Sequence, residues 1–111
     1  MQGWTLDEDV TIKGDFNLNS GTLNLNGHQM IIESNFSQVG GEVRFNEGKM
    51  EVAGNCSITG GNLKMESDND YMLVKGDYYV SCYWANVVVL EKGVLELKGD
   101  FQVTSSWCIG V

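Results

Sequence analysis

A short triplet recurs five times along this chain: a glycine, or once a serine, then Asp or Asn, then an aromatic residue or cysteine. The triplets begin at Gly14, Ser34, Gly54, Gly76 and Gly99, so their second residues are 20, 20, 22 and 23 positions apart. A near-constant period of this length is the sequence signature of a repeat that stacks on itself. The period therefore constrains the architecture more than any other feature of the chain.

Apolar residues form columns when the five units are aligned on their triplets. Two and four positions before each triplet stand Ile12 and Val10, Ile32 and Met30, Val52 and Met50, Val74 and Met72, and Leu97 and Leu95. Alternation with a period of two is typical of a strand that has one buried face. The pattern within each unit therefore predicts three short strands, which are separated by Gly-Asp or Gly-Gly corners.

Three strands in 20 to 23 residues are too few for a propeller blade, which takes roughly 40–45 residues. They suit one coil of a solenoid, in which each strand pairs with the same strand one coil further on, at about 4.8 Å. We predict an all-β, single-stranded parallel β-helix (β-solenoid) of about five coils. An antiparallel sandwich is the structural alternative, since it also uses short strands and glycine turns. It gives no reason for the same residue type at the same phase five times.

The length of 111 residues predicts one domain, residues 1–111. Within it, residues 1–9, with Trp4 and Leu6, are a candidate N-terminal cap. Residues 81–90 interrupt the pattern and are read as an insertion. Residues 104–111 form an apolar end segment with no capping charge, and an uncapped last coil exposes strand edges to a partner.

Composition narrows the function classes. A formal charge of −8 and a pI near 4.3 argue against nucleic-acid binding, and no apolar stretch is long enough for membrane insertion. The first nine residues lack the features of a signal peptide, so a cytoplasmic chain and a piece of a longer secreted one both stay open. Three cysteines cannot all pair within the chain, and Cys56, in a column of aromatic residues, is expected to be buried.

No catalytic or metal-binding constellation emerges from the residues. Asp15, Asp77 and Asp100 share the corner position with two asparagines, which favours a turn role through bonds to nearby backbone. Residues 67–70 are rich in oxygen ligands but lack the spacing of a calcium loop. His28 has no nucleophile or acid at a fixed phase beside it. We therefore expect no enzyme activity, no cofactor and no metal.

Two neighbouring insertions are the most distinctive local features. Residues 66–71 are polar, and residues 81–86 are rich in aromatic side chains. Exposed aromatic residues beside acids suit contact with a protein or a glycan. The candidate binding residues are Asp68, Asp70, Tyr71, Tyr83 and Trp84.

The stretch from Trp4 to His28, and residues 63–65, 69–77 and 93–101, resemble a repeat of large bacterial proteins, mostly from Gram-positive groups. The resemblance extends from about Trp4 to Val103. It implies a β-solenoid module within long surface-associated or secreted polypeptides, and it implies no catalytic residues.

These observations predict a non-enzymatic structural, spacer or adhesion module of a bacterial surface or secreted protein. One alternative is a small acidic intracellular protein that binds and inhibits a protein partner. Another is a solenoid that polymerises through its ends. The location is extracellular if the chain is part of a longer protein, and cytoplasmic if the chain is complete.

Overall fold

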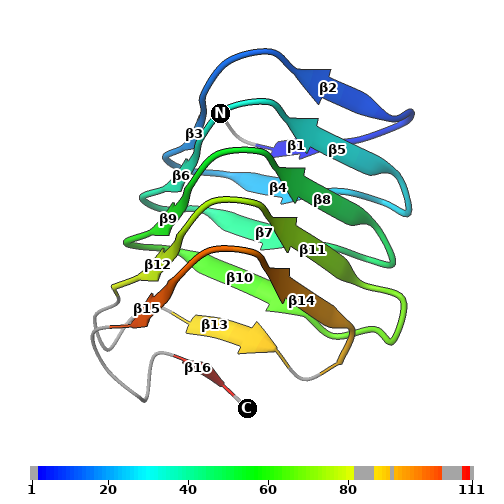
Figure 1. Ribbon diagram of the computed structural model, residues 1–111. Helices are drawn as coiled ribbons and strands as arrows, with labels where there is room; N and C mark the ends of the chain where they lie inside the picture. The colour runs from blue at the N-terminus through cyan, green and yellow to red at the C-terminus, as the bar shows by residue number, and fades with distance from the viewer. Residues whose placement is uncertain (1–2, 82–86, 91, 104–108, 111) are drawn as a thin grey trace.

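The computed structural model describes residues 3–81, 87–90, 92–103 and 109–110, which form strands and turns and contain no helix. The strands wind about a common axis and stack into three parallel sheets (Figure 1). The predicted parallel β-solenoid is therefore confirmed. No helix capable of crossing a membrane is found in these ranges.

Each coil contributes one strand to each of three sheets, which we call sheets A, B and C. Sheet A contains β1 (Gly3–Thr5), β4 (Thr22–Asn24), β7 (Glu42–Arg44), β10 (Asn62–Met65), β13 (Val87–Leu90) and β16 (Ile109–Gly110). Sheet B contains β2 (Val10–Ile12), β5 (Gln29–Ile32), β8 (Lys49–Val52), β11 (Tyr71–Val74) and β14 (Val94–Leu97). Sheet C contains β3 (Phe16–Leu18), β6 (Phe36–Gln38), β9 (Cys56–Ile58), β12 (Tyr78–Val80) and β15 (Phe101–Val103).

The register of the sheets follows the period of the sequence. In sheet C, Phe16 pairs with Phe36, Phe36 with Cys56, Cys56 with Tyr78 and Tyr78 with Phe101. All strand pairs are parallel and join equivalent positions of successive coils, which excludes the antiparallel sandwich. The five strands of sheet B, and likewise those of sheet C, are separated by four steps, so the solenoid makes about four turns where the sequence predicted about five coils.

The core is a set of side-chain columns that run the length of the solenoid. Its buried members are Leu6, Leu18, Leu23, Leu25, Met30, Ile32, Phe36, Val43, Phe45, Met50, Val52, Cys56, Ile58, Leu63, Met65, Met72, Val74, Tyr78 and Val80. Full burial of a valine, leucine, isoleucine, methionine or phenylalanine side chain stabilises the fold by about 1.5–3 kcal/mol. Aromatic rings stack in one column, with Phe16 5.8 Å from Phe36 and Tyr78 5.5 Å from Phe101.

The corner between sheets B and C explains the recurring triplet. Glycine is favoured where successive corners touch: a Cβ atom on Gly76 would lie 2.6 Å from the carbonyl oxygen of Gly54, although the second corner accommodates Ser34 at the same position. The next residue accepts a hydrogen bond from the coil that follows, as when the backbone N–H of Asn55 donates to Oδ1 of Asn35 at 2.8 Å. The third residue points into the core.

The same bond repeats along the whole corner. The side chains of Asp15, Asn35, Asn55 and Asp77 each accept the backbone N–H of the equivalent residue one coil on, at 2.8–3.0 Å. The sequence predicted a turn role with bonds to nearby backbone. The bonded backbone is instead 20 to 23 residues away in sequence, because stacking makes it the closest donor.

Three segments singled out in the sequence take part in the stack where they are described. Part of the expected N-terminal cap is β1, which pairs with β4. The last four residues of the expected insertion are β13, which pairs with β10, whereas residues 82–86 lie outside the described residues. In the end segment β16 pairs with β13.

Candidate functional site

The predicted binding residues fall into two groups. Asp68 and Asp70 lie in the turn between β10 and β11, and Tyr71 is the first residue of β11, so these three are close in the chain and in space. Tyr83 and Trp84 lie outside the described residues. The structure therefore bears on three of the five predicted binding residues.

Asp70 is turned inward and is only 2% exposed. Its Oδ1 atom accepts the backbone N–H of Glu47 at 2.6 Å, and its Oδ2 atom accepts those of Glu66 and Ser67 at 2.8 and 3.0 Å. A buried carboxylate is stable only when such donors replace water. Asp70 ties its turn to the preceding coil, and its carboxylate is not offered to a partner.

Asp68 and Asn69 lie at the exposed tip of the same turn. The Asn69 side chain donates to Oε1 of Glu47 at 3.0 Å, and its backbone N–H donates to Oγ of Ser67 at 3.4 Å. The tip is thus held against the preceding coil while the Asp68 side chain faces solvent. Of the three described candidates, Asp68 is the one a partner reaches most easily.

Tyr71 lies on the outer face of sheet B. Its hydroxyl donates to Oε1 of Glu96 at 2.7 Å, and the Lys49 ammonium stands 4.9 Å from the ring centroid. The hydrogen bond to Glu96 raises the pKa of Tyr71. The same bond, together with one to Lys98, lowers the pKa of the Glu96 carboxyl. The Tyr71 ring is therefore fixed in place and half-exposed.

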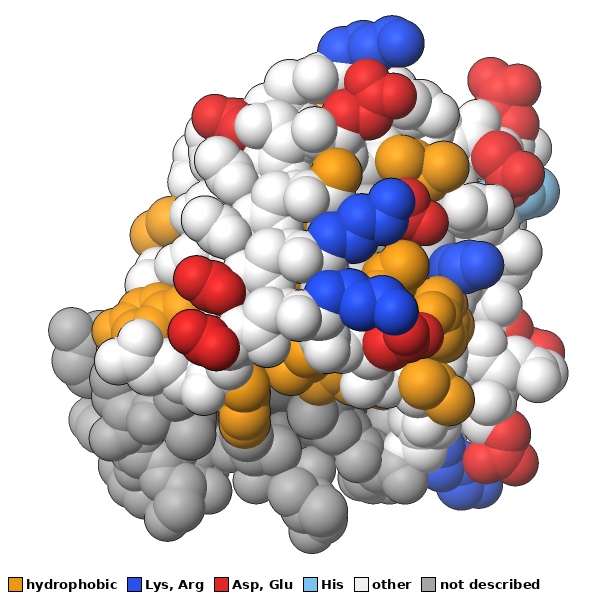
Figure 2. Space-filling view, in the orientation of Figure 1, with side chains coloured by type: hydrophobic (Ala, Val, Ile, Leu, Met, Phe, Trp, Pro, Cys, Tyr) orange, Lys and Arg blue, Asp and Glu red, His pale blue; other side chains and the backbone are white. Residues whose placement is uncertain are grey.

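The outer face of sheet B mixes charged and apolar side chains (Figure 2). Ion pairs follow the strands at Lys13–Glu33 (3.7 Å), Lys75–Glu51 (3.3 Å) and Lys98–Glu96 (2.9 Å). Exposed pairs of this kind contribute about 0–1 kcal/mol each. They also place both signs of charge on this face of the molecule.

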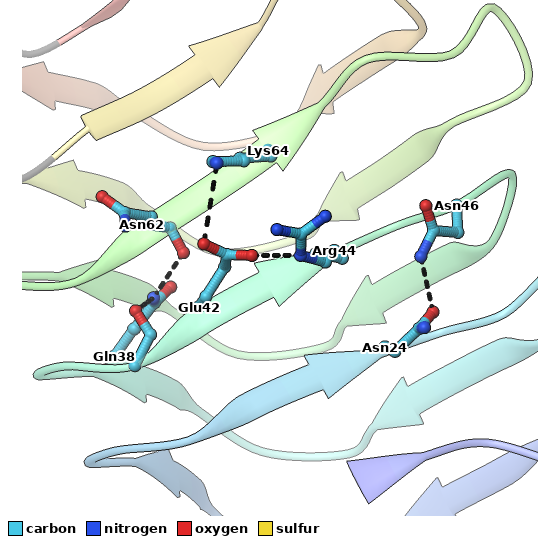
Figure 3. A network of polar contacts seen from close by, with 8 residues as sticks. Asn24, Gln38, Glu42, Arg44, Asn46, Asn62 and Lys64 are labelled. Atoms are coloured by element: carbon cyan, nitrogen blue, oxygen red, sulfur yellow. Dashed lines mark hydrogen bonds and ion pairs between the residues drawn. The ribbon is translucent and has the colours of Figure 1, made fainter. Parts of the chain in front are cut away.

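The outer face of sheet A has a network of polar contacts (Figure 3). Glu42 forms ion pairs with Arg44 on its own strand and with Lys64 one coil on, the latter at 3.6 Å. Asn46 donates from its side chain to Oδ1 of Asn24 at 2.8 Å. Such contacts join neighbouring coils from outside, as the core columns do from inside.

A shallow hollow of about 200 Å³ opens where sheet A meets the turn that holds Asp70. It is lined by Arg44, Phe45, Asn46, Glu47, Lys64, Glu66, Ser67 and Asp70. Its two cations are already paired with Glu42, and the Asp70 carboxylate is satisfied by backbone donors. Across the described ranges, no group of three or more His, Cys, Asp or Glu side chains is placed to hold a metal ion.

One buried polar side chain was not singled out from the sequence. Gln38 stands in a core column with Leu18, Ile58 and Val80, and its Nε2 atom donates to the carbonyl oxygen of Asn62 at 2.7 Å. Its Oε1 atom and the Tyr78 hydroxyl are buried without a hydrogen-bond partner among the described residues. The sequence did contain a signal for this residue, because it is an amide in an otherwise apolar column.

No protein-family model, no curated protein and no solved structure matches this chain.

Proposed function

We propose that this chain is a non-enzymatic structural or spacer module of a bacterial surface or secreted protein, with adhesion through its exposed loops. The observation that carries the proposal is the uninterrupted in-register stack from β2 to β14 and from β3 to β15. Such a stack fixes the distance and orientation between whatever is attached at its two ends.

Stiffness is supported by three kinds of contact between coils. Backbone hydrogen bonds join strands along each sheet, side-chain columns fill the interior, and the corner ladder of Asp and Asn links successive coils. Each inner coil is thus bound on both sides, and bending would disturb all three sets together. The surface or secreted location rests on the resemblance of the repeat, not on the geometry.

Adhesion is supported by the exposure of Asp68 and the half-exposed ring of Tyr71. The alternative of an acidic inhibitor that imitates a nucleic acid has less support, because lysines interleave with glutamates on sheet B. A mimic needs a continuous anionic face.

The spacer proposal is tested by measuring the distance between two spin labels on the rod. Asn17 and Gln102 stand in one outward column of sheet C, four ranks apart, so labels on Asn17→Cys and Gln102→Cys are expected about 19 Å apart. The labelled chain also carries Cys82→Ser and Cys108→Ser, and it is diluted with unlabelled chain so that only the distance within one copy is measured. We expect a narrow distance distribution that stays unchanged when folded domains are fused to both ends. A broad distribution, or one that shifts with the fused domains, would contradict a spacer role.

Adhesion is tested separately, with a glycan array and purified peptidoglycan as probes. Binding that is lost in Asp68→Ala and in Tyr71→Ala, and kept in Thr11→Ala on the first coil of the same sheet, supports adhesion through this turn. Equal binding by all three variants would mean that the binding site lies elsewhere on the chain.

A further inference from the structure

The last described coil differs from the inner coils in the exposure of its core residues. Phe101 is 47% exposed, whereas Phe36, Cys56 and Tyr78 in the same column are at most 1% exposed. Leu95 and Leu97 are only partly buried, although the equivalent residues of β11 are fully buried. The end of the solenoid that carries β14 and β15 thus presents inward-facing apolar side chains. We call it the C-terminal face.

The opposite end has the matching surface, which we call the N-terminal face. Val10, Ile12 and Phe16 are partly buried there, and the equivalent residues of the next coil are fully buried. They belong to the same columns as Leu95, Leu97 and Phe101. The two end faces are therefore the two halves of the interface that the chain repeats between its own coils.

Among the described strands, sheets B and C end at β14 and β15, with no strand beyond them, and sheet A extends one rank further to β16. The ranks beside β14 and β15 hold no described strand. In a second copy, the first strands of these two sheets are β2 and β3. An unpaired edge of this kind is a template for adding a strand from another chain.

We propose that the C-terminal face binds the N-terminal face of a second copy of this chain, head to tail and in register. The rings of Phe101 and the partner copy's Phe16 then continue a column in which neighbouring rings already stack at 5.5 and 5.8 Å. The Asp100 carboxylate accepts the backbone N–H of the second copy's Asp15, as Asp77 accepts that of Asp100 at 2.9 Å. This inference does not depend on the proposed function.

The proposal carries a geometric condition. In the stacked pair, β16 of one copy and β1 of the other occupy the same rank of sheet A, between β13 and the second copy's β4. Only one of the two strands can occupy this position in sheet A. We assign the position to β16, because β16 is already paired with β13. The second copy's β1 then detaches from its β4.

Charge also sets a condition for association. Each copy carries a formal charge of −8, so two copies repel one another at low ionic strength. Added salt screens this repulsion. The associated fraction is therefore expected to rise between low and moderate salt.

The test uses single cysteines on the outward column of sheet C. In the proposed stack, Gln102 lies beside Asn17 of the second copy, at about the 4.8 Å spacing of paired strands, and this spacing is within the Cα range of a disulfide. Asn17→Cys and Gln102→Cys are made in separate chains, each with Cys82→Ser and Cys108→Ser, while Cys56 stays buried. Circular dichroism first establishes that each variant is folded.

We expect a disulfide-linked dimer when the two variants are mixed under mild oxidation, and none with either variant alone. Ser57→Cys mixed with Gln102→Cys is the matched control, since Ser57 is in the same column at mid-rod, and it should give no dimer. A dimer in either single variant means that like ends meet, which overturns the proposal. The absence of any dimer in the mixture overturns it as well.

Light scattering of the unaltered chain gives an independent result. The mass should rise with concentration, and Phe101→Glu should keep the mass at that of a monomer. A monomeric unaltered chain at every concentration and salt level would overturn the proposal.

Discussion

At the scale of single residues, the equivalent turns of two successive coils both need two residues with positive φ, and they use different residues to supply them. Asn26 and Gly27 have φ values of 51° and 77°, and Asn46 and Glu47, one coil on, have 46° and 69°. The left-handed conformation costs a residue with a Cβ atom roughly 1–2 kcal/mol and costs glycine almost nothing. Glu47 is held there because Asp70 accepts its backbone N–H.

We expect Glu47→Gly to stabilise the protein by about 1 kcal/mol, since it removes this strain and keeps the backbone donor. Thermal unfolding followed by circular dichroism measures the change. Gly27→Ala is the matched control: a Cβ atom at Gly27 meets no atom within 4 Å, so its cost comes from φ alone and the midpoint should fall. A lower midpoint for Glu47→Gly would show that its side-chain bond to Asn69 outweighs the strain.

Cys56 is the smallest side chain in the aromatic column, and burial raises the pKa of its thiol. Cys56→Val preserves an apolar side chain of similar volume and should cost less than about 1.5 kcal/mol. Cys56→Asp places an unpaired carboxylate in the core and should abolish folding. Circular dichroism and chemical unfolding distinguish the two variants. A well-folded Cys56→Asp protein would contradict the register of sheet C.

At the scale of elements, the corner between sheets B and C determines how closely coils approach. A Cβ atom on Gly76 would lie 2.6 Å from the Gly54 carbonyl oxygen, whereas one on Gly14 would meet no atom within 4 Å. The difference arises because Gly14 belongs to the first described coil, and no described strand stacks on the outer side of that coil.

Gly76→Ala should therefore destabilise the protein by more than 1 kcal/mol, because backbone must move to admit the methyl group, whereas Gly14→Ala should change stability little. Urea unfolding of both variants measures the two free energies. Equal effects would mean that the corners do not touch as described.

The corner ladder also makes a pH prediction. Hydrogen bonds from the Ser34 side chain and the Asn35 backbone lower the pKa of Asp15 below the usual range of an aspartate. A carboxyl whose folded pKa is depressed contributes stability above its unfolded pKa, and that contribution is lost as the pH falls through the folded pKa. Asp15→Asn should thus reduce the loss of stability below about pH 4, because an amide oxygen still accepts the bond, as Asn35 does. Urea unfolding at several pH values across this range measures the free energy of unfolding. If Asp15→Asn loses as much stability at low pH as the unaltered chain, the ladder does not depend on the charge of Asp15 as described.

The sequence predicted the elements well where one residue type recurs at one phase. Columns such as Phe16–Phe36–Cys56 appear directly in the aligned triplets because parallel stacking places equivalent residues side by side. It predicted the turn of residues 66–70 poorly. Asp70 reads as one more polar residue in an insertion, and only the stacked preceding coil reveals the three backbone donors that bury it.

At the scale of the whole molecule, stability comes from contacts between coils. Every strand pair joins residues 19 or more positions apart in sequence, so a single coil has little to hold it in isolation. The edge strands β3 and β15 pair on one side only, which is why Phe16 and Phe101 are more exposed than the residues between them in the column. The same physics that makes the interior rigid leaves both ends able to bind another coil.

The central claim is the in-register parallel stack, and NOE spectroscopy of the labelled protein tests it most directly. Ile31 of β5 is paired with Thr11 of β2 and with Glu51 of β8. We predict cross-peaks between the backbone protons of Ile31 and those of the neighbouring strands β2 and β8, whose paired residues lie 20 positions before and 20 positions after Ile31 in the sequence. Cross-peaks that instead join β5 to β6 or β4 in antiparallel register, without contacts one coil away, would contradict the solenoid.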